Sequence, residues 1–84
     1  MTKVEYNGWT NYETWNLNLM YESFFQSFAS EQRFKDESAL AEALESAIEE
    51  IELEQLNENS LAHFAVSEYL DQINWQEIAK HYIE

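Results

Sequence analysis

The chain has 84 residues, with seventeen Asp or Glu against four Lys or Arg, so its formal net charge is −13. Three Trp, five Tyr and five Phe supply enough apolar surface for one core, which excludes the disordered class that such acidity otherwise suggests. The chain has no Pro, one Gly and no Cys, which argues against a turn-rich all-β fold and excludes a disulfide framework and a thiolate zinc site.

Residues 1–9 are predicted to form a short N-terminal arm that ends in an Asn7-Gly8 turn. The segment Thr10-Asn11-Tyr12-Glu13 matches a capping box, with a hydroxyl at the N-cap and a carboxylate three residues later. It predicts a first helix from about Asn11 to about Phe28. Apolar side chains point nearly all round this helix, so we expect it to be the central helix, packed on several sides. They are Trp15, Leu17, Leu19, Met20, Tyr21, Phe24 and Phe28.

A second helix is predicted from Asp36 or Glu37 to about Leu56, after a polar connection. One side of it is apolar at 100° per residue, with Leu40, Leu44, Ala47, Ile48 and Ile51. The other side carries an acidic ridge of Glu42, Glu45, Glu49 and Glu52, which Glu50 and Glu54 widen. Leu53 and Leu56 fall next to that ridge. Either the helix bends before them, or they meet another element, or they are exposed for a partner.

Two further helices are predicted. Asn59 or Ser60 is expected to cap a third helix that extends to about Gln72. Asn74, with Glu77 three residues later, is expected to cap a fourth. Their apolar faces comprise Leu61, Phe64, Ala65, Tyr69 and Ile73 in the third helix and Trp75, Ile78, Ala79, Tyr82 and Ile83 in the fourth. The predicted fold class is all-α: one domain, residues 1–84, folded as a compact bundle of about four helices behind the arm.

The distribution of charge is uneven, because the stretch from Asp36 to Glu77 carries twelve carboxylates and no Lys or Arg. Like charges at i,i+3 or i,i+4 destabilise a helix by about 0.2–0.5 kcal/mol per pair, and a surface optimised for stability mixes both signs. Three interpretations are open. The acidic face is simply solvated, or it belongs to a salt-loving host, or it mimics a nucleic acid, which carries regularly spaced negative charges.

Mimicry predicts a small acidic DNA-mimic inhibitor that occupies a Lys/Arg-rich nucleic-acid-binding surface of a host protein. The expected partner is a host defence nuclease or a CRISPR effector, ahead of transcription machinery or a chromosomal DNA-binding protein. Nucleic acid and anionic membranes are expected to be repelled. The predicted partner-binding residues are Glu42, Glu45, Glu49, Glu50, Glu52 and Glu54, with Leu53 and Leu56 adding specificity. The alternative is an interaction or assembly module of incidental acidity, homodimeric through Leu53 and Leu56.

The string from Asn7 to Asn16, NGWTNYETWN, is the most distinctive in the chain. It resembles the start of small, functionally uncharacterised helical proteins of phages, plasmids and prokaryotic genomes, which begin with GWTN-x-ETWN. Those proteins often close with W-x-EIA, like Trp75 to Ala79 here. The resemblance implies a compact α domain of mobile-element origin and supplies no catalytic residues. In charge and size alone the chain is similar to anti-restriction and anti-CRISPR proteins, which is an analogy.

Within the motif, Trp9 and Tyr12 are either core aromatics or exposed interface anchors.

Elsewhere we find no sequence pattern typical of a catalytic or metal-binding site. Glu77 and His81 stand at i,i+4, but a metal site needs three or four ligands. Phosphate-loop and nucleophile-elbow motifs are absent from the sequence. We therefore expect no enzyme activity, no cofactor and no metal. Without a signal segment or a membrane-length apolar run, we expect a cytoplasmic protein of a prokaryotic cell.

Overall fold

Four helices make up the fold of residues 8–83, the part of the chain that this computed structural model describes. They are α1 (Tyr12–Glu31), α2 (Glu37–Leu53), α3 (Leu61–Asp71) and α4 (Trp75–Tyr82). The predicted all-α fold is therefore confirmed. Most of the predicted arm, residues 1–7, lies outside the described residues. Gly8 follows with φ 88°, a left-handed conformation that other residues rarely adopt.

Each helix begins at a side chain that accepts a hydrogen bond from the backbone N–H three residues further on, which satisfies one of its unpaired N–H groups. These N-cap residues are Asn11, Asp36, Ser60 and Asn74. The cap predicted at Asn74 is confirmed, Ser60 is one of the two residues considered for α3, and Asp36 lies at the predicted start of the second helix. The prediction that Thr10 caps α1 is wrong, because the Asn11 carboxamide accepts the Thr14 N–H at 2.8 Å. That shift by one residue frees the Thr10 hydroxyl for another contact.

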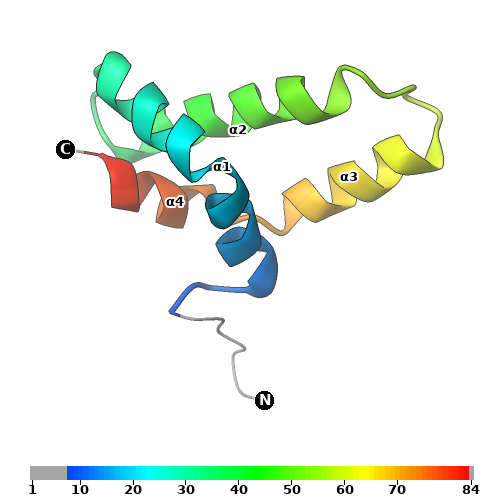
Figure 1. The fold of residues 1–84 in the computed structure, drawn as a ribbon, viewed down its shortest axis with the longest axis horizontal. Coiled ribbons are helices and arrows are strands. Elements are labelled where there is room, and N and C mark those ends of the chain that lie inside the picture. Colours follow the sequence, from blue (N-terminus) through cyan, green and yellow to red (C-terminus); the bar gives the residue numbers. More distant parts are fainter. Residues whose placement is uncertain (1–7, 84) are drawn as a thin grey trace.

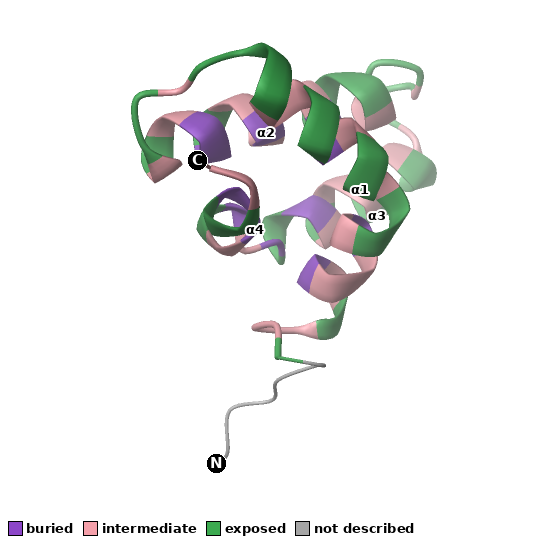
Figure 2. Ribbon diagram, turned by 60° about the vertical axis from the view of Figure 1, so that its left-hand side comes forward, coloured by how far each residue is buried: buried purple, intermediate pink, exposed green. Residues whose placement is uncertain are grey.

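The core lies where α4 packs against both α2 and α1, while α3 packs along the second half of α2. Figure 1 shows α2 and α3 running side by side, joined at the end of the molecule furthest from α4. Figure 2 shows the buried residues of α1, α2 and α4 gathered where these helices meet. The core comprises Leu17, Phe25, Leu40, Ala41, Leu44, Ile48, Leu70, Ile73, Trp75, Ile78 and Ala79. The apolar face predicted for α4 is confirmed, since its residues are all buried or half-buried.

α1 is not the central helix that its composition suggests. Leu19 is 58 % exposed and Met20 is 64 % exposed, because one side of the helix faces outward. Tyr21 interrupts the helix with φ −114° and ψ 17°, and the ribbon bends there (Figure 1). The more deeply buried helix is α2, in which Leu40, Leu44 and Ile48 are wholly inaccessible.

Part of the apolar face predicted for α3 is likewise exposed rather than buried. Leu61 is 81 % exposed and Phe64 is 60 % exposed, and Ala65 is exposed as well. α3 packs against α2 through the opposite side, where Leu70 is buried and Val66 contacts the core. Helical spacing shows which residues share a face, but it does not show whether a neighbour covers that face.

Candidate functional site

The NGWTNYETWN motif joins the start of α1 to the α3–α4 connection through a set of hydrogen bonds that we call the clasp. The Thr10 N–H donates to Glu77 Oε1 at 3.0 Å, and the Asn74 carboxamide donates to the Thr10 hydroxyl at 3.1 Å. The buried Thr14 hydroxyl accepts the Asn74 N–H at 2.9 Å, and Asn11 donates to the Gln72 carbonyl at 2.8 Å. The polar residues of the motif therefore hold the fold together.

The aromatic residues of the motif are divided between packing and exposure. The Trp9 indole is half-buried and stacks on the His81 ring, with centroids 4.3 Å apart. Tyr12 remains 47 % exposed, and its ring lies 5.7 Å from that of Trp15. Of the two interface anchors considered from the sequence, Tyr12 is the more exposed.

The carboxylates of α2 lie on more than one side of the helix. Those of Glu42, Glu49, Glu50 and Glu54 are exposed, whereas Glu45 and Glu52 are half-buried. The predicted single ridge of Glu42, Glu45, Glu49 and Glu52 is therefore wrong in part, because two of its members turn toward neighbouring helices.

An acidic hollow of about 500 Å³ lies where α2 ends and α3 begins. It is lined by Ser46, Glu49, Glu50, Leu53, Glu54, Leu56, Glu58 and His63. Four carboxylates thus surround one depression, to whose lining the described part of the chain contributes no Lys or Arg. Glu58 belongs to this group although the sequence analysis did not select it, because the loop after α2 returns it to the end of the helix.

Glu45 faces α3, where the charge of Asp71 reaches it. Burial, followed by the charges of Glu49, Asp71 and Glu42, raises the pKa of the Glu45 carboxyl. The folded state therefore binds this proton more tightly than the unfolded chain does, so the charged form of Glu45 destabilises the fold at neutral pH.

Replacing Glu45 with Gln should raise the free energy of unfolding at pH 7 by about 0.4–1 kcal/mol, since it removes two like-charge pairs along α2. The gain should disappear as the pH falls below the ordinary carboxyl pKa, where Glu45 is protonated in both states. Thermal unfolding at pH 7 and near pH 3 measures it, with Glu22→Gln on the exposed side of α1 as the matched control. A lower melting temperature for Glu45→Gln at pH 7 would contradict this account.

Glu52 is engaged inside the molecule. Its carboxylate accepts a hydrogen bond from the Tyr21 hydroxyl, which links the end of α2 to the bend in α1. Burial and then the hydrogen bond and charge of Glu52 raise the pKa of Tyr21 to about 12. Glu52 therefore has less freedom to meet a partner than Glu49 or Glu50.

The sequence allows three interpretations of Leu53 and Leu56: a bend in the helix before them, contact with another element, or exposure for a partner. For Leu53 the structure supports contact with another element. α2 ends at Leu53, and Leu53 packs against the core. Leu56 is half-buried in the turn beyond the helix and lines the acidic hollow. Both leucines thus contribute apolar walls to this corner.

An apolar groove of about 370 Å³ separates α1 from α3, and sequence reasoning missed it. Its lining consists of Asn16, Leu17, Met20, Glu52, Ala65, Val66, Tyr69 and Leu70. Met20 and Ala65, which the sequence analysis assigned to apolar faces for burial, line this groove, and no local signal in the sequence shows that these faces stay uncovered.

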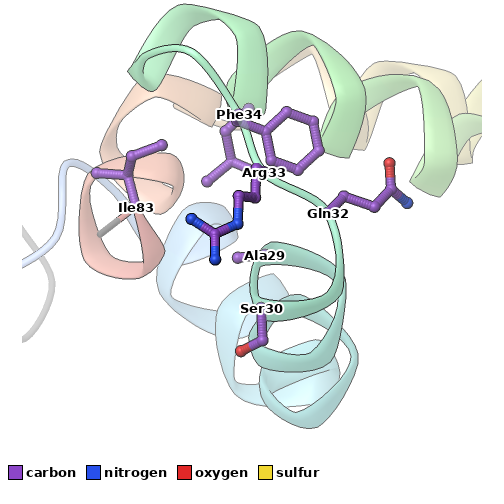
Figure 3. A pocket seen from close by; sticks show the side chains of 7 residues that line it. Ala29, Ser30, Gln32, Arg33, Phe34 and Ile83 are labelled. Carbon is purple, nitrogen blue, oxygen red and sulfur yellow. The ribbon is translucent and has the colours of Figure 1, made fainter.

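A smaller hollow of about 190 Å³ carries the opposite charge. Figure 3 shows the Arg33 guanidinium pointing into the space between Ile83 and Ala29. Arg33 and Lys35 lie in the α1–α2 connection, at the other end of α2 from the acidic hollow (Figure 1). Arg33 and Lys35 thus lie away from the acidic hollow, but Asp36 and Glu37 follow them at the start of α2, so both ends of this helix carry carboxylates.

Among residues 8–83, no group of three or more His, Asp or Glu side chains is placed to hold a metal ion. Within the same range, none of the helices has the length and apolar character needed to cross a membrane.

These features define a small acidic all-α domain with an acidic hollow between the end of α2 and the start of α3 and an apolar groove between α1 and α3. The chain belongs to a family of unknown function, DUF7249, whose model matches residues 2–84. No curated protein and no solved structure matched the chain.

Proposed function

We propose that this protein is an inhibitor that works by occupancy: its α2–α3 corner docks on a Lys/Arg-rich nucleic-acid-binding surface of a host protein. The single observation that carries the proposal is the acidic hollow, in which Glu49, Glu50, Glu54 and Glu58 surround one depression, with no compensating Lys or Arg from residues 8–83 in its lining. Such carboxylates accept paired hydrogen bonds from guanidinium groups.

The scaffold supports this proposal. Glu54 is the C-cap of α2 and keeps helical backbone angles, so it lies four residues beyond Glu50 with an offset of about 6 Å along the helix axis. A helix holds that spacing rigidly, and the net charge of −13 would accelerate encounter with a basic surface. The proposed role is binding rather than catalysis. The proposed setting is the cytoplasm of a prokaryotic cell. The motif resemblance suggests mobile-element origin, and a defence nuclease or a CRISPR effector is the proposed target.

The test is competition. Purified restriction nucleases, CRISPR effectors and nucleoid proteins are bound to labelled duplex DNA, and this protein is titrated in at low and high salt. Displacement from at least one of them is expected, and it should weaken as salt rises. The double substitution Glu50→Lys and Glu54→Lys should weaken displacement at least tenfold, since each charged hydrogen bond contributes about 1.5–3 kcal/mol.

The matched control is Glu22→Lys with Glu31→Lys, two exposed positions on α1 that change the net charge equally. If both double variants weaken displacement to the same extent, the α2–α3 corner has no special role and the acidic face is only solvated. If no DNA-binding protein is displaced, mimicry is wrong.

The alternative of an assembly module that dimerises through Leu53 and Leu56 receives less support. Leu53 packs against the core, and Leu56 stands among carboxylates that a second copy would repel.

A further inference from the structure

We infer that the apolar groove between α1 and α3 receives the apolar face of a basic amphipathic helix from the partner protein. This inference deepens the proposed function and rests on it for the basic character of the partner. It also adds an apolar contact in the groove, which would select one basic protein among many, as charge alone does not.

The groove has a buried floor and an accessible wall. Leu17 and Leu70 are 3 % and 5 % exposed and form its base, whereas Met20 is 64 % exposed at its edge. Met20 is long and flexible, and such thioether side chains suit surfaces that receive other apolar side chains. The volume of about 370 Å³ lies within the range of small binding pockets.

Hydrogen bonds fix the groove in shape. The Asn16 carboxamide donates to the Tyr69 hydroxyl at 2.9 Å and to Met20 Sδ at 3.6 Å, so it ties the wall on α1 to the wall on α3. Tyr21 holds the Glu52 carboxylate in position in the lining. A groove formed in advance lowers the entropy cost of binding.

Charge decides which occupant fits. Among residues 8–83, Glu52 is the one charged residue in the lining. The hydrogen bond from Tyr21 limits its movement but uses one of its acceptor positions, so acceptor capacity remains for a Lys or Arg that enters the groove. A second copy of this chain would bring another net charge of −13 to the same face, which opposes self-association. A helix that lays apolar anchors into a groove and flanks them with cations satisfies both requirements.

The experiment uses a fluorescent helical peptide as the probe, with Leu at positions i, i+4 and i+7 and Lys at the flanking positions. Binding to the full chain is measured by anisotropy, and the contacted residues are mapped by amide chemical shifts. The Leu/Lys peptide should bind and should shift the amides of Asn16, Val66 and Tyr69. Met20→Ser should weaken binding about tenfold, because it removes an apolar wall.

Leu19→Ser is the matched control, since Leu19 adjoins Met20 and is similarly exposed but does not line the groove. Leu19→Ser should leave the binding of the Leu/Lys peptide unchanged. The circular dichroism spectra of Leu19→Ser and Met20→Ser should match that of the unchanged protein. A peptide with Gln in place of Leu should bind at least tenfold more weakly, as should one with Glu in place of Lys.

Other results overturn the inference. These are equal losses for Leu19→Ser and Met20→Ser, full binding by the Gln peptide, or a concentration-dependent dimer in sedimentation that Met20→Ser abolishes.

Failure of this inference can be distinguished from failure of the proposed function. If Glu50→Lys with Glu54→Lys abolishes DNA competition while Met20→Ser changes nothing, the proposed function stands and the groove has no such role. If Met20→Ser weakens peptide binding but no DNA-binding protein is displaced, the groove binds a basic helix and the inhibitor proposal fails.

Discussion

Truncating Phe25 to Ala should destabilise the domain by about 3–5 kcal/mol, the range for removing a buried aromatic side chain. Phe25 has no exposed surface, and its ring lies within 6.0 Å of the rings of Tyr21, Phe24 and Tyr82. Small domains have a total stability of about 5–15 kcal/mol, so the variant should be partly unfolded at moderate temperature. Denaturant titration followed by circular dichroism measures the loss.

The control for Phe25 is Phe64, which has the same side chain and is 60 % exposed on α3. Phe64→Ala should change the free energy of unfolding by about 0.5 kcal/mol or less. Equal losses at the two positions would mean that α3 packs more of its surface than the structure shows.

Replacing Thr14 with Val should cost about 1–3 kcal/mol, although the two side chains have nearly the same shape. The Thr14 hydroxyl is wholly buried and accepts the Asn74 N–H at 2.9 Å. Valine leaves that N–H without its acceptor in the clasp. Thermal unfolding should show a fall of roughly 4–8 °C for each kcal/mol lost.

Thr14→Ser tests whether the hydroxyl or the methyl group is responsible. Serine keeps the acceptor and loses one methyl group, so its cost should stay near 1 kcal/mol. If Thr14→Ser is as destabilising as Thr14→Val, packing and not the hydrogen bond to Asn74 dominates at this position.

Local signals in the sequence predicted most of the secondary structure. Asp36, Ser60 and Asn74 are residues that cap helices, and each stands directly before an apolar repeat. Thr10 failed as a cap because Asn11, a more favourable N-cap residue than Thr, accepts the Thr14 N–H one residue later.

Long-range contacts decided the rest. Periodicity placed Met20 and Phe64 on apolar faces, but the four short helices do not cover every such face. The candidate site was predicted only in outline for the same reason. Glu49, Glu50 and Glu54 share the acidic hollow, whereas Glu52 turns to Tyr21, a partner 31 residues away that no local pattern indicates.

The clasp also determines when the chain can complete its fold during synthesis. Its hydrogen bonds join residues 60 to 67 positions apart, so the donors and acceptors in residues 10–14 meet their partners in residues 72–77 only after that later segment has been synthesised. Until α4 emerges from the ribosome, α2 lacks the helix against which much of its apolar side packs. Residues 8–83 therefore complete their fold only once α4 is available to α1 and α2, and a message truncated before Trp75 should yield a product that proteases remove.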